Sequence, residues 1–204
     1  MSLIPLGFEC ESASALVVGG GRVGTRHALA MLEAGARVRV IAPIVSDDLR
    51  AESARNERLS LAQREYSGAE DIQDATLVIA ATESRSVNES VARDARLAGR
   101  AVNVADAPDT GSFVFLAAHR AGPVTIGVSA GSVPNAAGRI RDAIAERIDS
   151  RYAEAVAECS ELRQRLLAAS GADGWRKVAT ALIDERFCEN VEAGTFSERA
   201  ARWR

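Results

Sequence analysis

The sequence has 204 residues, of which 47% are hydrophobic and 26% charged, and a formal net charge of −3. This length can bury a core of its own, and the slightly negative charge argues against a general affinity for nucleic acids or anionic membranes. The three scattered cysteines, Cys10, Cys159 and Cys188, argue against a disulfide framework or a zinc site. No stretch has the pattern of a signal peptide or a membrane span, so we expect a cytoplasmic protein.

Strand and helix patterns alternate in the first half of the chain. Apolar runs typical of strands occupy residues 15–20, 36–43, 59–66, 75–82 and 100–106. Residues 22–35 and 84–99 have apolar side chains at helical spacing and end at a glycine. This alternation predicts an α/β fold, a Rossmann-type parallel sheet with helices on both faces. We expect this domain to cover residues 1–113.

The pattern changes in the second half of the chain. Residues 112–118 and 122–130 are predicted to be strands joined by a short His-Arg-Ala-Gly connection, as a β-hairpin. The chain is then expected to be helical to Ser170, with another helix at about 174–188. A ribbon this short and apolar is marginal alone, so we expect residues 114–150 to form a dimerisation region of a homodimer. Residues 151–204 are predicted to be a C-terminal helical domain.

A glycine-rich loop lies between the first strand and the first helix. Gly19, Gly21 and Gly24 have the Gly-x-Gly-x-x-Gly spacing. The first glycine permits a tight turn, the second lets the backbone approach a pyrophosphate, and the third lets helix and strand pack closely. The helix N-terminus would face the phosphate charge. The strand–turn–helix context predicts a bound dinucleotide, against the alternative of a glycine turn without a ligand.

The second strand lacks the acidic residue that usually holds the ribose of a dinucleotide. Backbone groups around Pro43 and Ile44, or the aspartates at 47–48, are left to do this. Arg37 and Arg39 could instead favour the 2′-phosphate of NADP. The sequence alone leaves NAD and NADP open.

Four blocks of sequence resemble one family when taken together. They are residues 15–43, 77–91, 102–115 and 122–144. In these blocks the chain resembles the precorrin-2 dehydrogenase and sirohydrochlorin ferrochelatase module of siroheme synthase, densely over roughly residues 3 to 150. Members oxidise precorrin-2 to sirohydrochlorin with NAD, and many then insert ferrous iron into the same macrocycle. The resemblance therefore implies a tetrapyrrole substrate, NAD as cofactor, a homodimer and, as a further activity left open, iron insertion.

The resemblance also implies which residues bind the cofactor. Positions that match the family's NAD contacts follow the first two strands, at Arg22, Val23, Pro43 and Ile44. Ala81 and Thr82, at the end of another strand, are expected to line the same crevice, because ligands lie beyond the carboxyl ends of parallel strands.

Asp106 matches the essential aspartate of the family, within the segment Asn-Val-Ala-Asp-Ala-Pro. A carboxylate there can accept the proton released in the oxidation and can also serve iron insertion. The alternative is an Asx-type turn before Pro108. Asp109 is the neighbouring candidate, which we expect to be solvated.

Residues 129–135 depart from the family, because Pro134 stands one position early and Asn135 replaces a proline. Ser129, Ser132 and Asn135 can donate to a substrate carboxylate at the helix N-terminus, or can simply cap the helix. This departure makes iron insertion a weaker expectation than oxidation.

The sequence is also compatible with two other functions. One is a dehydrogenase that leaves iron insertion to a separate chelatase. The other is a non-catalytic nucleotide-sensing Rossmann module, which would leave the Asp106 segment and the hairpin unexplained. His27 and His119 are isolated in the sequence, so we expect packing or surface roles for them and predict no metal site.

Overall fold

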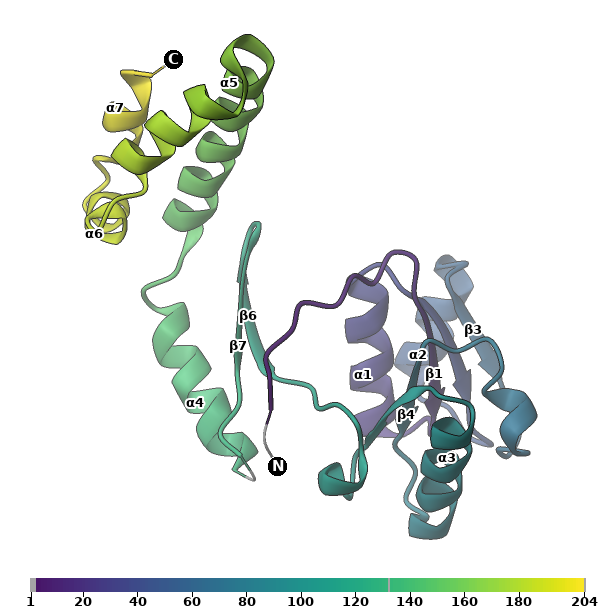
Figure 1. The fold of residues 1–204 in the computed structure, drawn as a ribbon. Coiled ribbons are helices and arrows are strands. Elements are labelled where there is room, and N and C mark those ends of the chain that lie inside the picture. Colours follow the sequence, from purple (N-terminus) through teal and green to yellow (C-terminus); the bar gives the residue numbers. More distant parts are fainter. Residues whose placement is uncertain (1–2, 132, 204) are drawn as a thin grey trace. The chain divides into compact units, whose positions relative to one another are not determined.

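The computed structural model describes residues 3–131 and 133–203 and divides into two compact units, one ending at Phe115 and the other beginning at Leu116 (Figure 1). Among the described residues, no helix is both long and apolar enough to cross a bilayer. The division of the chain into three domains stays a prediction.

The first unit is built on a five-stranded parallel sheet with the order β3-β2-β1-β4-β5. Its strands are β1 (Ser14–Val18), β2 (Arg37–Ile41), β3 (Leu59–Ala62), β4 (Leu77–Ala80) and β5 (Ala101–Val104). Its helices are α1 (Arg22–Glu33), α2 (Asp47–Arg55) and α3 (Arg85–Leu97), with the short 3₁₀ helices η1 (Ala69–Asp71) and η2 (Pro108–Thr110). In the central register, Val17 of β1 pairs with Val40 on one side and Ile79 on the other. The predicted Rossmann-type fold is confirmed.

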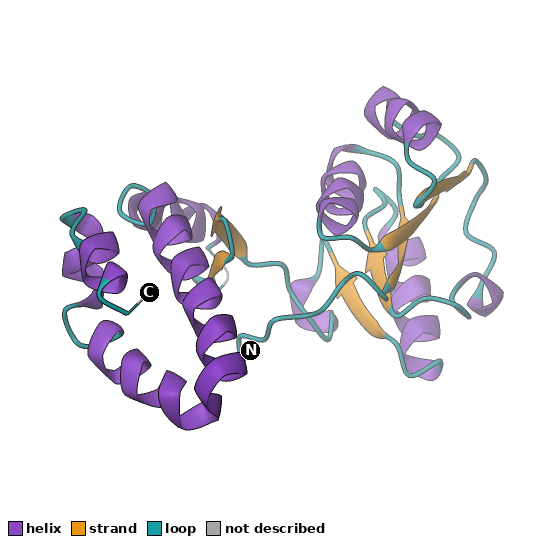
Figure 2. Cartoon of the chain, turned by 90° about the horizontal axis from the view of Figure 1, so that it is seen from above, coloured by secondary structure: helices purple, strands orange, loops and turns teal. Residues whose placement is uncertain are grey.

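Helices cover both faces of this sheet (Figure 2). Val17 packs in the cluster that contains Met31 of α1, whereas its neighbour Val18 packs in the cluster that contains Val91 of α3. Successive side chains of a strand point to opposite faces, so a strand with both faces covered must be apolar throughout. Each such buried side chain stabilises the fold by about 1.5–3 kcal/mol.

Two local features of the first unit differ from the sequence expectations. Helix α2 was not predicted; it begins after Ser46, whose Oγ accepts a hydrogen bond from the Leu49 amide. The strand expected at 59–66 is too long, because β3 ends at Ala62. The chain then turns around the buried Asp71 carboxylate, which binds the Arg64 guanidinium and the amide and hydroxyl of Ser67.

The hairpin of the second unit consists of β6 (Ala117–Ala121) and β7 (Val124–Val128), which pair antiparallel. The strand predicted at 112–118 is therefore wrong, and so is the connection at His-Arg-Ala-Gly. The strands turn at residues 122–123, where Gly122 has a φ of +56°. The aromatic residues before β6 pack instead: Phe113 and Phe115 lie against the core of the first unit.

The helical elements after the hairpin are α4 (Pro134–Ala145), α5 (Ser150–Leu182), α6 (Phe187–Glu192) and α7 (Phe196–Ala201). The helix expected to run unbroken to Ser170 is interrupted after α4, and the Asp149 side chain accepts from the Arg151 amide at the start of α5. The range of α5 contains two successive helices, divided at Gly171, whose φ of +69° and ψ of −165° are not helical. The predicted helix end at Ser170 and the separate helix after it are therefore confirmed, although the second helix ends at Leu182 and not at 188.

Candidate functional site

The glycine loop lies where the order of the strands reverses. From β1 the chain continues to β2 on one side of β1, and later returns to β4 on its other side. Backbone hydrogen bonds fix the strand ends there: the Gly19 amide donates to Ile41, and the Ala81 amide donates to Val18. In open α/β sheets, ligands bind at this switch point, beyond the carboxyl ends of the strands.

The three motif glycines have different surroundings. Gly19 has a φ of +122°, and a Cβ added to it would overlap the carbonyl oxygen of Ala81. A Cβ at Gly24 would overlap the carbonyl oxygen of Gly19, so α1 packs directly on the loop. A Cβ at Gly21 would meet nothing within 4 Å. Gly19 and Gly24 are therefore required by the fold, whereas the space above Gly21 is open to a ligand.

The N-terminus of α1 suits a phosphate group. Gly21 is its N-cap residue, no side chain caps it, and its first turn contains no acidic residue. The neighbouring helices α2 and α3 are capped by the hydroxyls of Ser46 and Ser84. The first amides of a helix have no partner within the helix, and the helix dipole favours an anion beside them. Arg22 and Val23 supply such amides, so this loop fits the pyrophosphate of a dinucleotide.

The loop after β2 is tied to the glycine loop. The Ser46 amide donates to the Gly20 carbonyl over 3.1 Å, and the hydroxyls of Ser46 and Thr25 lie 2.9 Å apart. Pro43 and Ile44 precede this anchor and are exposed, with 79% of Ile44 accessible. An exposed isoleucine held beside the glycine loop offers an apolar contact to the adenosine half of a dinucleotide.

The charged alternatives for holding the ribose lie in two different places. Asp47 is exposed in the first turn of α2 and pairs with Arg50. Arg37 and Arg39 lie near the amino end of β2, where they line a shallow cavity of about 500 Å³ together with Arg58 and Asp74. The glycine loop is at the carboxyl end of the strands, so the two arginines do not line the crevice, and the geometry does not favour the idea that they bind a 2′-phosphate.

A buried asparagine connects the ends of β4 and β5. Asn88 of α3 is only 1% exposed. Its Oδ1 accepts from the amide and the hydroxyl of Thr82, over 3.0 and 2.8 Å. Its Nδ2 donates to the Thr82 carbonyl over 3.0 Å and to Oδ1 of Asp106 over 2.9 Å.

Asn88 was not singled out from the sequence. A signal for it exists, because it shares the buried face of α3 with three apolar residues, Val91, Ala92 and Ala95. A polar side chain on such a face must find partners inside the protein.

Asp106 is exposed just beyond the end of β5. Among the described residues, its only side-chain hydrogen bond comes from Asn88. An Asx turn would need the backbone N–H of the residue two positions later, which is Pro108 and has none. The structure therefore argues against the turn-forming alternative for Asp106. Asp109 is exposed in η2, as expected.

The predicted substrate loop belongs to the second unit. Ser129 and Asn135 are exposed, and Ser132 lies outside the described residues. In the described part of the chain, no side chain caps α4, whose N-cap residue is Val133. The capping alternative for Ser129 and Asn135 thus has no support, and their role in substrate binding stays a prediction.

Both histidines are engaged within the protein. His27 is buried and stacks on Phe115, with ring centroids 4.2 Å apart. Burial, with a smaller effect of Arg26, lowers the pKa of His27 to about 4. His119 lies in β6 rather than in a turn, and its Nε2 is 2.5 Å from the Ile148 carbonyl oxygen. No group of three metal-binding side chains occurs among residues 3–131 and 133–203.

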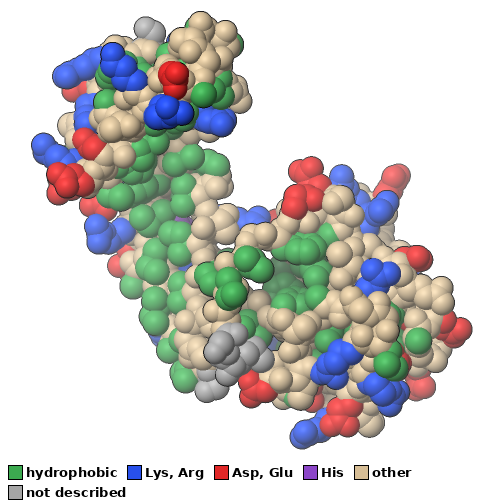
Figure 3. All heavy atoms as spheres, viewed as in Figure 1, with side chains coloured by type: hydrophobic (Ala, Val, Ile, Leu, Met, Phe, Trp, Pro, Cys, Tyr) green, Lys and Arg blue, Asp and Glu red, His purple; other side chains and the backbone are tan. Residues whose placement is uncertain are grey.

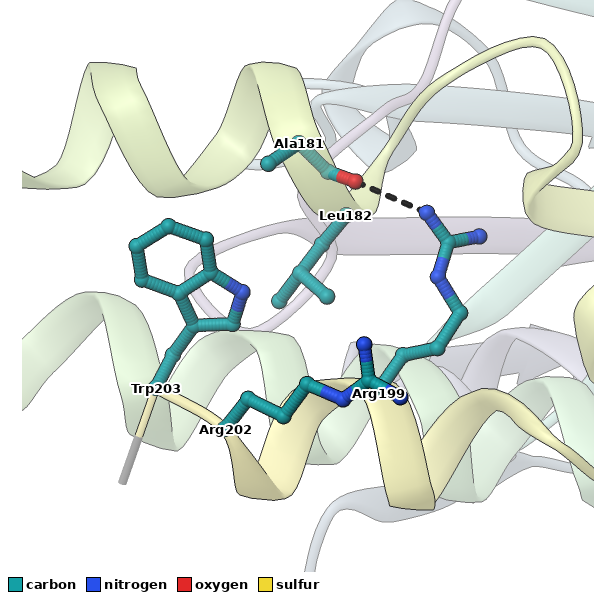
Figure 4. Close-up of a pocket in the computed structure, with 5 residues that line it drawn as sticks. All are labelled: Ala181, Leu182, Arg199, Arg202 and Trp203. Atoms are coloured by element: carbon teal, nitrogen blue, oxygen red, sulfur yellow. Dashed lines mark hydrogen bonds between the residues drawn. The ribbon is translucent and has the colours of Figure 1, made fainter.

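The second unit has a small hollow of about 270 Å³ near its last helix (Figure 4). Its lining residues are Ala181, Leu182, Arg199, Arg202 and Trp203. Arg199 donates to the Ala181 carbonyl and pairs with Asp184, each over 2.9 Å. The hollow contains none of the predicted site residues, and Arg199 is engaged within the protein.

Comparison with known proteins agrees with this geometry. A family model described as "Putative NAD(P)-binding" matches residues 6–117. The chain is 33% identical over 201 residues to siroheme synthase of Saccharophagus degradans, and 34% identical over 203 residues to that of Pseudomonas paraeruginosa. Both alignments include 98% of this chain but only 42% and 41% of the relatives. The chain thus spans about two fifths of the length of these curated relatives.

The fold is similar to a solved structure over its whole length. The structure of SirC, precorrin-2 dehydrogenase, matches with a TM-score of 0.75 and 23% identity, covering 98% of this chain and 100% of that chain. The resemblance to siroheme synthases that the four sequence blocks indicated is confirmed.

Proposed function

The chain belongs to the NAD(P)-binding family whose model matches residues 6–117, and from this premise we propose that it oxidises precorrin-2 to sirohydrochlorin with NAD. The observation that carries the proposal is the identity of 33–34% with siroheme synthases along 98% of the chain. The uncapped α1 N-terminus and the open space at Gly21 support the choice of a dinucleotide as cofactor. We place the reaction in the cytoplasm, where NAD is available and thiols stay reduced; no disulfide joins the three cysteines.

The roles of the residues follow from the crevice. Gly21, Arg22 and Val23 bind the pyrophosphate, and Pro43 and Ile44 contact the adenosine half. The NAD, when bound, accepts the hydride that leaves the macrocycle.

Ala81 and Thr82, which directly follow β4, line the same crevice. Asp106 accepts the proton released with the hydride, as a general base at the edge of the sheet. Its exposure leaves it accessible to a large substrate, and Ser129, Ser132 and Asn135 bind the peripheral carboxylates of that substrate.

The test is to incubate the protein with precorrin-2 and NAD and to follow NADH by its absorbance. The proposal predicts one NADH for each sirohydrochlorin formed. A nucleotide sensor would bind NAD without forming NADH, and that result would refute an enzymatic role. Replacing NAD by NADP in the same assay decides which dinucleotide is used.

We also propose ferrous iron as a second substrate, inserted into sirohydrochlorin at the same site to give siroheme. The support is that both relatives bear the name siroheme synthase. Chelation must remove protons from pyrrole nitrogens, and Asp106 is the general base available for this step. The assay above, repeated with ferrous iron, should show the loss of the sirohydrochlorin spectrum. An unchanged spectrum would identify a dehydrogenase that leaves iron insertion to another enzyme.

We propose, finally, that the active form is a homodimer held by the hairpin and α4. In the described part of the chain, the β6–β7 sheet has only two strands, so each strand has an unpaired outer edge. Hydrophobic side chains gather over the hairpin and α4 (Figure 3), and 47% of Ile140 is exposed. Unpaired edges and exposed apolar side chains favour contact with a second copy.

A further inference from the structure

We propose that Asn88 is a positioning residue, whose amide holds the Asp106 carboxylate in place at the end of β5. This inference rests on the proposed role of Asp106 as general base. Asn88 itself would not touch the substrate, because only 1% of it is exposed. Its effect on the reaction would pass through Asp106.

The hydrogen bonds of Asn88 fix which way its amide faces. Oδ1 accepts from the amide and the hydroxyl of Thr82, so the nitrogen must face the other two partners. These partners, the Thr82 carbonyl and Oδ1 of Asp106, are both acceptors and match the two N–H donors of Nδ2. Flipping the amide would place an oxygen against both acceptors. The surroundings therefore hold the donor toward Asp106.

The carboxylate needs such a partner because nothing else in the described residues binds it. Asp106 is exposed, and its only side-chain hydrogen bond uses Oδ1. Without this bond, the side chain would be free to rotate. With it, one oxygen is anchored and Oδ2 has no partner among the described residues, so Oδ2 is the atom that can accept a proton. A misplacement of a reacting group by about 1 Å can lower a rate by about 10²-fold.

The same asparagine links the base to the cofactor loop. Thr82 follows Ala81, whose carbonyl oxygen lies against Gly19. Asn88 bonds Thr82 on one side and Asp106 on the other, so a continuous path of contacts joins the glycine loop to the carboxylate. A residue with this double role would set the distance between the cofactor and the proton acceptor.

The alternative is a purely structural role, in which Asn88 only satisfies the buried Thr82 backbone and the contact with Asp106 is incidental. Asn88→Asp separates the two roles. The new carboxylate still accepts from the Thr82 amide and hydroxyl, but it cannot donate to Asp106 and sets a like charge against it. We expect kcat for NADH formation to fall by about 10- to 100-fold, with the Kd for NAD and the KM for precorrin-2 within about twofold of wild type.

A matched control addresses the loss of stability. Ser84→Ala removes the side-chain cap of α3, which accepts from the Val87 amide, and leaves the Asn88–Asp106 contact intact. We expect it to lower the thermal midpoint and to leave kcat unchanged. If Asn88→Asp does not fold, Asn88→Ser serves instead, because its shorter side chain removes the Nδ2 donor to Asp106 without adding a buried charge.

The exchanged pair Asn88→Asp with Asp106→Asn completes the experiment. It restores one hydrogen bond between the two positions with donor and acceptor reversed. We expect the thermal midpoint to recover relative to Asn88→Asp, while kcat stays as low as in Asp106→Asn.

Three results would overturn the proposal: a kcat within twofold of wild type in both Asn88 variants, an equal loss of kcat in Ser84→Ala, or no recovery of the midpoint in the exchanged pair. Wild-type protein that forms no NADH from precorrin-2 would instead refute the proposed function, while the midpoint of the exchanged pair would still test the contact.

Discussion

A charge at Gly21 should abolish cofactor binding without harming the fold. Gly21 has φ −79° and ψ −172°, which any residue adopts, and an added Cβ meets no heavy atom within 4 Å. An aspartate is also a good N-cap residue beside the positive end of α1, so Gly21→Asp should leave the free energy of unfolding unchanged or raise it by up to about 1 kcal/mol. Thermal unfolding of the apoprotein measures this.

The effect on NAD binding should have the opposite sign. A carboxylate at this position would occupy the space that we assign to the pyrophosphate, and two like unit charges about 4 Å apart repel each other by about 4 kcal/mol at an effective dielectric constant of about 20. This corresponds to an NAD affinity weaker by about 10³-fold, measured by calorimetric titration. Gly21→Asn, with the same size and capping ability but no charge, should weaken NAD binding much less. An NAD affinity within tenfold of wild type in Gly21→Asp would refute the placement of the pyrophosphate.

Three further predictions follow from the structure. Asp106→Asn should lower NADH turnover by about 10²–10⁴-fold with little change in NAD affinity, and full activity would remove Asp106 from the mechanism. The Arg64 guanidinium holds the pKa of Asp71 below its usual range. The ion pair between them therefore contributes fully to the stability of the fold above pH about 4, and this contribution is lost as the pH falls. Urea unfolding of Asp71→Asn should accordingly show about 2 kcal/mol less stability at pH 7, a difference that narrows below pH about 4, whereas the exposed Asp47→Asn changes little. Light scattering at micromolar concentration should give a dimer, and a monomer would contradict the hairpin interface.

The sequence could predict the sheet because its signals are local. The central strands are buried on both faces, which requires unbroken apolar runs, and helices α1 and α3 end at glycines with positive φ, Gly35 and Gly99. The hairpin was harder to predict for the opposite reason. The apolar run at 112–118 has the pattern of a strand, yet Phe113 and Phe115 pack against the core of the first unit. Whether such a run pairs as a strand or packs on a core depends on the tertiary fold.

For the candidate site, the sequence by itself predicted the glycine loop, because the spacing of Gly19, Gly21 and Gly24 between a strand and a helix is a local pattern. It also singled out Asp106, through its likeness to a family. Only the tertiary structure showed that Asp106 contacts Asn88, which is 18 positions earlier in the chain, and that Arg37 and Arg39 lie toward the amino ends of the strands, away from the glycine loop. The physical reason is that parallel strands bring their carboxyl ends together at one end of the sheet. The neighbours of a site residue at that end therefore come from distant segments, and the spacing of these segments in the sequence does not reveal the contact.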